Sequence, residues 1–506
     1  MKSVMFVSLI LVLAMGIAMA GGIVGNTNQS AAFVRTLNRN ASTDVDAVYF
    51  NPAGLTRLED GLYLSLSNQS IFQTKTVTNS YQFLNTDEFV GDVKALLFPN
   101  FYLAYKTGKL AFSAGFEPIG GGGSANFEKG LPSFELPVSD LKAKLGMNYR
   151  LNTSFEGSSI YYGGQAGITY KLNDMVSVAV GARYVMASNS YLGHLKDIEI
   201  QTTSGWMRAD DYFNAASANA AGAATSLQPL VDGGASGLTL AEAQGAGYLT
   251  AAQVAQLEGG LTQVGLNPAN YPTVGATQAA YNGVSATMTA TAGQLGDVEV
   301  DAVQKGSGIT PIFSAFITPF EGLDIALRYE MKTKLELENE TEVDGSGLFP
   351  DGGKTNTDMP AMMALGVSYK VMPALRSEFN LNYYLHSDVN WDGREDNVEN
   401  GYEAGVAVEY CLNDKLKASV GFLNADGGAK PAYQTDISYS LKSNTIALGA
   451  AYAVSPNLIV NVGGMNTFYQ DCERPFSHTL GTIDIPVIET YKKTSIGFAV
   501  GVDYKF

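Results

Sequence analysis

The chain is poor in charge and in the residue types that build metal sites and disulfide scaffolds. Only 16% of its 506 residues are charged, whereas about 25% is usual. It has 2 cysteines, Cys411 and Cys472, and 3 histidines. We expect the cysteines at opposite ends of the fold, so a bridge between them is not predicted. The net charge of −17 disfavours nucleic-acid binding, which needs clustered Lys and Arg.

Recognisable catalytic and metal-binding patterns are also missing. His194, His386 and His478 fall in or beside different predicted outer loops, and none has metal-ligand spacing to a second His or Cys. A Ser-His-Asp site can draw on residues far apart in the chain, so the sequence alone leaves it open. We predict no enzyme and nominate no catalytic residue, metal ligand or cofactor.

The first twenty residues have the features of a signal peptide. Lys2 precedes an almost wholly apolar run from Val4 to Ala18, and 18–20 reads Ala-Met-Ala. This pattern predicts cleavage before Gly21 rather than a membrane anchor. After Gly21 there is no uninterrupted apolar run of about 20 residues. If the mature chain crosses a membrane, it must do so as a closed β-barrel.

Strict alternation of apolar and small or polar residues is the strongest positive signal. In the last segment one face carries only apolar side chains: Ile496, Phe498, Val500, Val502, Tyr504 and Phe506. The other face suits an aqueous lumen: Ser495, Gly497, Ala499, Gly501, Asp503 and Lys505. A strand of a soluble sandwich alternates in the same way, but the pattern recurs along the whole chain.

Roughly fourteen such strands can be counted, beginning near 61, 98, 109, 160, 174, 309, 321, 360, 374, 401, 414, 443, 457 and 493. Tight turns such as 106–109 and 172–174 alternate with long connections at about 71–97, 119–159, 188–308, 339–359, 390–400, 425–442 and 470–492. This asymmetry is typical of outer-membrane barrels. We predict an all-β, antiparallel transmembrane barrel of about fourteen strands, with both termini periplasmic.

The 188–308 connection is exceptional in length and composition. Its centre is rich in Ala, Gly, Thr and Gln, and Thr239–Glu242 and Thr250–Gln253 fit the capping-box pattern. Short helices are therefore expected inside this loop. A functional role and a flexible surface elaboration are equally compatible with it.

Residues 21–60 precede the first strand and do not alternate. They carry apolar side chains that need burial: Phe33, Val34, Leu37, Val45, Val48, Tyr49 and Phe50. In a wide barrel the lumen is the available place, so we predict an N-terminal plug, or hatch.

The hatch ends in the motif Asn51, Pro52, Ala53, Gly54, Leu55. This motif, the plug and about fourteen strands together resemble the FadL-type transporters of long-chain fatty acids and hydrocarbons, and the segment 115–124 is also similar to branches of that family. The resemblance covers the whole mature chain. It implies a hatch-gated barrel, a hydrophobic groove on the loops 188–308 and 339–359, and a lumen binding site. Asn51 could hydrogen-bond strand backbone, or form an ordinary turn.

The resemblance further implies a kink in the third strand, at about 109–118, that opens the barrel wall sideways. The candidate residues are Pro118, Gly120, Gly121, Gly122 and Gly123, which cannot hold regular pairing well. The alternative is that these glycines simply begin an outer loop.

A carboxylate ligand would need a fixed cation in an apolar pocket. Alternation points four basic side chains inward: Arg183, Arg328, Lys370 and Arg376. Each is a candidate headgroup contact, and each could instead pair with a lumen carboxylate such as Glu330 or Glu378.

The leading functional expectation is passive, hatch-gated uptake of hydrophobic molecules, long-chain fatty acids above all, across the bacterial outer membrane. The alternatives are a general porin, and a surface adhesin or receptor carried by the 188–308 loop. Expected partners are the ligand, outer-membrane lipids and the barrel-assembly machinery, for which Phe506 would be the signal.

Overall fold

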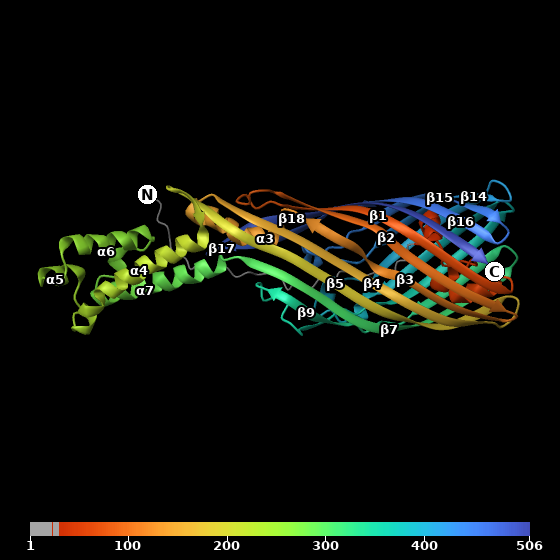
Figure 1. Ribbon diagram of the computed structural model, residues 1–506, viewed down its shortest axis with the longest axis horizontal. Helices are drawn as coiled ribbons and strands as arrows, with labels where there is room; N and C mark the ends of the chain where they lie inside the picture. The colour runs from red at the N-terminus through yellow and green to blue at the C-terminus, as the bar shows by residue number, and fades with distance from the viewer. Residues whose placement is uncertain (1–22, 24–29) are drawn as a thin grey trace.

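The computed structural model describes Ile23 and residues 30–506. The predicted signal peptide and its cleavage site lie outside these residues. The described chain forms a long barrel with a helical unit projecting from one end (Figure 1).

In the described chain, fourteen strands close the barrel, each antiparallel to the next. They are β1 (Gly61–Asn79), β2 (Glu88–Thr107), β3 (Leu110–Phe127), β4 (Tyr149–Lys171), β5 (Val176–Thr202), β7 (Val298–Phe320), β8 (Leu323–Glu330), β11 (Ala361–Met372), β12 (Leu375–Leu385), β13 (Gly401–Cys411), β14 (Leu416–Asp426), β15 (Ser443–Ser455), β16 (Leu458–Tyr469) and β18 (Ile483–Lys505). Closure comes from β18 pairing with β1, from Tyr63 opposite Lys505 to Asn79 opposite Glu489. The predicted strand number and antiparallel order are confirmed.

The outward face of these strands is apolar and exposed. Leu448 is 63% exposed, Phe498 56% and Val500 59%. The alternate positions point inward and are small or polar, as at Gln69, Gln165, Ser419 and Ser495, all of them buried. An exposed apolar surface of this extent belongs in lipid, and the polar interior is typical of a transmembrane barrel.

The two ends of the barrel differ. Six short connections lie at the turn end: 107–110, 171–176, 320–323, 372–375, 411–416 and 455–458. Phe506 lies at the same end (Figure 1). The long connections lie at the opposite, loop end. Four further strands belong to them: β6 (Gly205–Arg208), β9 (Glu336–Asp344), β10 (Lys354–Asn356) and β17 (Cys472–Leu480).

Several predicted loops are wrong at their edges, because strands continue where loops were expected. β1 runs to Asn79, β5 to Thr202, and β7 begins at Val298 rather than near 309. Apolar alternation marks only the part of a strand that faces lipid. Beyond the membrane both faces can be polar, while the backbone pairing continues.

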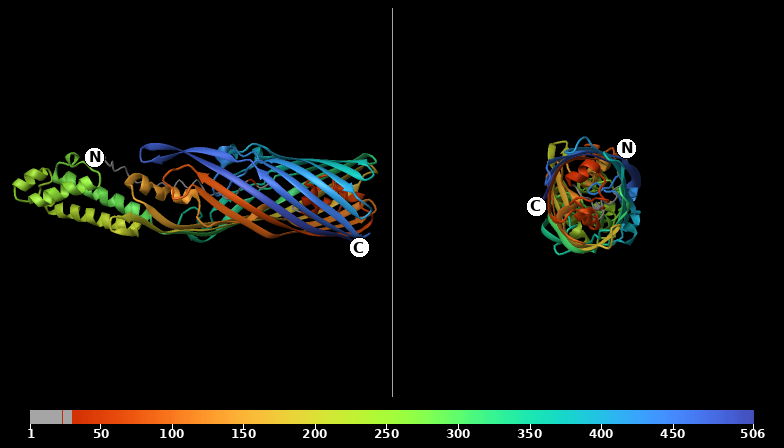
Figure 2. Two further views of the ribbon diagram at one scale, coloured as in Figure 1. Left: turned by 90° about the horizontal axis from the view of Figure 1, so that it is seen from above. Right: turned by 90° about the vertical axis from the view of Figure 1, so that its right-hand side faces the viewer.

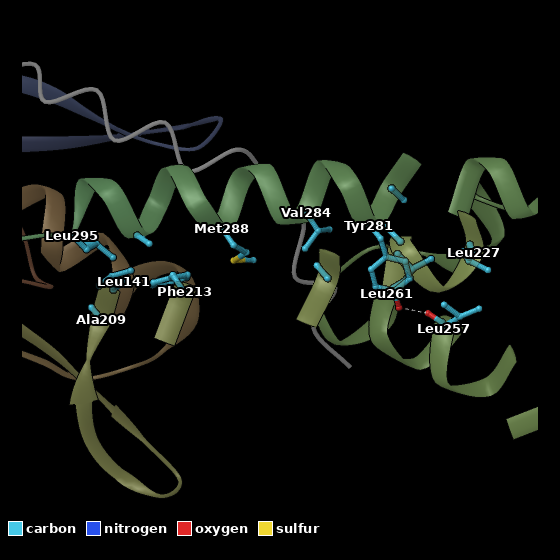
Figure 3. Packing of buried hydrophobic residues seen from close by; sticks show 14 of the residues in the cluster. Leu141, Ala209, Phe213, Leu227, Leu257, Leu261, Tyr281, Val284, Met288 and Leu295 are labelled. Carbon is cyan, nitrogen blue, oxygen red and sulfur yellow. Dashed lines mark hydrogen bonds between the residues drawn. The ribbon is translucent and has the colours of Figure 1, made fainter. Parts of the chain in front are cut away.

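The helices of the 188–308 connection form a separate packed unit. They are α4 (Ala209–Asp232), α5 (Leu240–Gly245), α6 (Ala251–Gln263), η2 (Pro268–Asn270) and α7 (Val274–Gln294). Both capping boxes are present, at Thr239 and Thr250. Phe213, Leu227 and Met288 belong to a core that also takes in α3 (Pro132–Leu145) through Leu141 (Figure 3). Among the residues described, no helix has both the length and the apolar character of a membrane span.

The hatch, defined here as residues 30–60, lies inside the ring of strands at the turn end, where Figure 2 shows it in red and orange. It contains α1 (Ala31–Thr36), α2 (Ala47–Phe50) and η1 (Pro52–Arg57). Ser30 caps α1 by accepting a hydrogen bond from the backbone N–H of Phe33. Three short 3₁₀ turns lie in the loop-end connections: η3 (His386–Asp388), η4 (Glu395–Asn397) and η5 (Pro431–Tyr433).

Candidate functional site

The hatch contacts the barrel wall on both sides. Helix α1 lies against β13, β14, β15, β16, β18 and β1, whereas η1 lies against β2, β3, β4, β5 and β7. The hatch therefore spans the lumen near the turn end.

Lumen-facing glycines let the hatch backbone approach the wall. A Cβ on Gly421 would lie 1.9 Å from the carbonyl oxygen of Thr36, and one on Gly449 would lie 2.3 Å from Cβ of Arg35. A Cβ on Gly366 would lie 2.6 Å from the backbone nitrogen of Ala41. A Cβ on Gly463 would lie 2.7 Å from the backbone nitrogen of Arg35, whereas Gly405 makes room for the side-chain amide of Asn38. These five glycines, on β11, β13, β14, β15 and β16, form the docking belt.

The Asn51–Gly54 motif fastens the other side of the hatch. The Asn51 side chain accepts a hydrogen bond from the N–H of Ala53 at 3.2 Å and so caps η1. Its Nδ2 also donates to two strand carbonyls, at 3.3 Å to Ala315 of β7 and at 3.1 Å to Leu327 of β8. The sequence leaves two roles open for Asn51, a local turn and a hydrogen bond to strand backbone. The structure shows both.

Pro52, Ala53 and Gly54 add further contacts to the wall and within the hatch. The Pro52 carbonyl accepts from Thr169 at 2.7 Å, and the Ala53 carbonyl accepts from Ser177 at 2.8 Å. A Cβ on Gly54 would lie 2.2 Å from the carbonyl oxygen of Ser42, so only glycine fits.

A buried ionic cluster lies against the hatch residue Tyr49. Arg183 donates to both carboxylate oxygens of Glu330, at 2.8 and 2.9 Å, and to Gln165 Oε1. Arg328 Nη1 donates to the carbonyl of Tyr49 and lies 3.4 Å from Glu330. Both guanidinium groups face the Tyr49 ring, at 4.8 Å for Arg183 and 5.3 Å for Arg328. The cluster joins β5, β8 and the hatch.

Glu117 lies at the edge of the same cluster, next to the predicted wall opening. Its carboxylate is 3.9 Å from Nε of Arg183 and is 1% exposed. Neither of its oxygens has a hydrogen-bond partner among the described residues. Glu117 is thus a buried acid whose contact with Arg183 is too long for a hydrogen bond.

Three of the four candidate headgroup cations are in ion pairs with lumen carboxylates. Arg183 and Arg328 pair with Glu330, and Arg376 pairs with Glu378 at 2.5 Å. Lys370 is exposed at the turn end of β11. A ligand contact by any of the four stays a prediction.

The pairing between β2 and β3 is interrupted. Val93 is opposite Ala125, and the next paired residues are Phe101 and Phe116. Residues 94–100 of β2 and 117–124 of β3 therefore face each other without a ladder; we call this stretch the wall gap. On the outer face beside it, β2, β3 and β4 form a groove of about 810 Å³ lined by Lys94, Ser124 and Glu156 among others.

Glycines shape the β3 side of the wall gap. The pairing of β3 with β4 shifts twice, between Pro118 and Gly120 and between Gly121 and Gly123. Gly121 has φ +90° and Gly123 +83°, and a Cβ on Gly121 would lie 2.0 Å from the carbonyl oxygen of Ser159. The predicted end of this strand at Pro118 is wrong, because Gly120, Gly121 and Gly123 remain paired with β4 and the whole segment 119–123 belongs to β3. The alternative that they begin a loop is wrong for the same reason.

On the β2 side of the wall gap, side chains of β1 form hydrogen bonds with backbone groups that are not paired with β3. Asn68 and Ser70 donate to the carbonyl of Leu96, at 3.0 and 2.9 Å. The N–H of Phe98 donates to Asn68 Oδ1 at 2.9 Å. Leu96 and Leu97 are 60% and 81% exposed. The carbonyl of Leu96 and the N–H of Phe98 thus have hydrogen-bond partners without β3.

Solved structures of known proteins share this fold. No protein-family model matches the chain, and no curated protein matches it. Among solved structures, it is similar to a Pseudomonas aeruginosa FadL homologue (TM-score 0.59, 13% identity, covering 96% of this chain and 100% of that one). It is also similar to the Pseudomonas putida toluene transporter TodX (0.54, 11%, 96% and 100%) and the Ralstonia pickettii toluene transporter TbuX (0.50, 13%, 96% and 97%). The predicted resemblance is confirmed for the fold.

Proposed function

We propose that this chain, with the fold of the FadL-type barrels, is an outer-membrane channel for passive uptake of hydrophobic molecules. Long-chain fatty acids and small aromatic hydrocarbons are the candidate substrates. The observation that carries this proposal is the wall gap between β2 and β3, in a barrel whose turn end is filled by the hatch.

The route follows from these two features. A molecule that enters the lumen from the loop end meets the hatch before it reaches the turn end. The wall gap offers a way out sideways, between Glu117 on the inside and Leu96 and Leu97 on the outside. Burial of each CH₂ group in an apolar environment is favourable by about 0.8 kcal/mol. A lateral exit into lipid therefore suits a hydrophobic molecule better than release into water.

In this proposal, movement of the hatch opens and closes the route to the wall gap. Its fold is braced internally by Arg39, which pairs with Asp46 at 2.7 Å. It touches the wall through backbone at the docking belt, through Asn51 and through Tyr49. A shift of the hatch would change the surroundings of Arg183 and Glu117 beside the wall gap.

We also propose the orientation. The loop end and the helical unit would face the exterior, and the turn end with Phe506 would face the periplasm. The backbone N–H of Phe506 donates to the carbonyl of Leu62 at 2.9 Å, so the last residue lies against the first strand.

Uptake measurements test the function. Radiolabelled oleate and toluene should accumulate faster in cells that carry the protein in the outer membrane than in cells without it. If cells with the protein accumulated oleate and toluene no faster than cells without it, the proposal would be wrong. A general porin would instead give a large single-channel conductance in planar bilayers with the full chain. We expect no such conductance while the hatch is in place.

A further inference from the structure

Two lysines face each other on the lumen wall in the loop-end half of the barrel. Lys75 of β1 and Lys493 of β18 are directly opposite in the register that closes the barrel. They share the inward face with Val77 and Tyr491, both fully buried, whereas Phe72 and Ile496 on the alternate face are exposed. Both lysines are half-buried, so part of each side chain remains accessible.

Neither lysine has an ionic or hydrogen-bond partner within residues 30–506, in contrast to neighbouring lysines. Lys492, on the outer face, pairs with Asp471 at 3.7 Å, and Lys442 pairs with Asp426 at 2.8 Å. Like charges directly opposite each other on two strands are destabilising. A bound anion between the two ammonium groups would offset their mutual repulsion.

The surroundings are aromatic and apolar. Nζ of Lys75 lies 5.7 Å from the ring centroid of Tyr439, and Nζ of Lys493 lies 4.8 Å from that of Tyr469. Tyr439 is held by its hydroxyl, which donates to the carbonyl of Lys492 at 2.9 Å. The rings offset part of the charge, but among the residues described the three donors of each ammonium have no acceptor.

An apolar cluster adjoins the two ammonium groups. Val77, Leu441 and Tyr491 are its buried members, and Tyr439 and Tyr469 pack against it. A paired cation beside such a surface matches a molecule with an anionic head and an apolar tail.

We propose that Lys75 and Lys493 bind the carboxylate of an amphiphilic ligand, whose acyl chain lies against Val77, Leu441 and the tyrosine rings. This inference rests on the proposed function and narrows it. It makes the loop-end half of the lumen selective for anionic amphiphiles over neutral hydrocarbons.

Binding to the purified full-length protein in non-ionic detergent tests this site. The probes are tritiated oleate and tritiated oleyl alcohol, which share the chain and differ in the charged head. The double variant Lys75→Gln with Lys493→Gln should lose about tenfold or more in oleate affinity, because charge-assisted hydrogen bonds are removed. Its affinity for oleyl alcohol should stay the same, and this also shows that the barrel is folded.

The matched control is Lys492→Gln, which removes a lysine next to Lys493 on the opposite face. It should leave both affinities unchanged. Unchanged oleate affinity in the double variant, or an equal loss for both probes, would overturn the inference. Failure of the proposed function gives a different result, since cells with the protein would then take up neither oleate nor toluene, whatever these lysines bind.

Discussion

Arg183 and Glu330 form a bidentate ion pair inside the barrel, in which Nη1 donates to Oε2 at 2.8 Å and Nη2 donates to Oε1 at 2.9 Å. Neither side chain is exposed. The hatch residue Tyr49 lies with its ring against Arg183. The pair thus joins two strands to the segment that fills the lumen.

Removal of the Glu330 charge should destabilise the barrel. Glu330→Gln leaves two buried guanidinium groups without their carboxylate, which commonly costs about 3–5 kcal/mol. Glu117, 3.9 Å from Arg183, can offset part of this loss. Urea unfolding of the protein in lipid vesicles measures the change in the free energy of unfolding.

The control for this change is Lys305→Gln. Lys305 pairs with Glu340, and the two side chains are 55% and 61% exposed. An exposed pair contributes roughly 0–1 kcal/mol. If Glu330→Gln cost no more than this control, the buried cluster would not stabilise the fold as described.

A side chain in the docking belt should dislodge the hatch. In Gly421→Val the new Cβ would need the space of the Thr36 carbonyl, 1.9 Å away. We expect trypsin to cut after Arg35 and Arg39 in this variant and not in the parent protein. Gly164→Val is the matched control, because nothing lies within 4 Å of a Cβ at that outward position. Protection of both arginines in Gly421→Val would contradict the direct contact.

Acidic pH should tighten the contact between α3 and the 427–442 loop. Asp436 in this loop accepts a hydrogen bond from the N–H of Ser133 at 2.8 Å. Burial raises the pKa of Asp436 above its usual value, although the bonds from Ser133 and the charge of Arg474 oppose the shift. A raised folded-state pKa adds stability below the unfolded pKa of about 3.9, and this is lost as pH rises through the folded pKa.

Hydrogen exchange of the α3 amides, corrected for the intrinsic rate at each pH, measures this effect. Protection in the parent protein should fall as the pH rises above about 4. Asp436→Asn should raise protection at pH 7 and flatten the profile, whereas Asp471→Asn, an exposed carboxylate, should not. A profile in Asp436→Asn that matches the parent would refute the assignment.

The helical unit should be dispensable for barrel assembly. Its core is largely its own, and Arg208 reaches Asp297 at 3.0 Å, so the two ends of the unit lie close together. Replacement of 209–295 by a short Gly-Ser linker should leave the amount of heat-modifiable barrel in the membrane unchanged. Loss of the inserted barrel would show that the helices support strand pairing. Retained uptake of oleate would separate transport from any partner-binding role of the unit.

Much of the barrel could be predicted from the sequence, because lipid on one face and lumen on the other impose strict alternation. The same alternation pointed Arg183 and Arg328 inward. It could not show that both meet Glu330, since that contact depends on the lateral register of three strands and on rotamers in the lumen.

Lys75 and Lys493 were missed for a related reason. Residues 71–97 lack apolar alternation and are predicted to form a loop, so the pattern assigns Lys75 to no face. The docking belt has a signal in the sequence, because small residues alternate with apolar ones along the predicted strands. The contacts of the docking-belt glycines depend on the path of the hatch backbone. The hatch sequence has no periodic pattern from which that path can be predicted.

A deletion in β3 tests whether hydrophobic molecules leave the barrel through the wall gap. Ile119 and Gly122 are the residues without a partner at the two register shifts of β3 against β4. Removal of both keeps the inward and outward alternation of β3 and straightens the strand across the wall gap. The measurement is the rate of toluene and oleate uptake by cells, normalised to the amount of folded barrel. If hydrophobic molecules leave through the wall gap, uptake of both compounds falls to the level of cells without the protein. Uptake at the parent rate would rule out lateral exit through the wall gap.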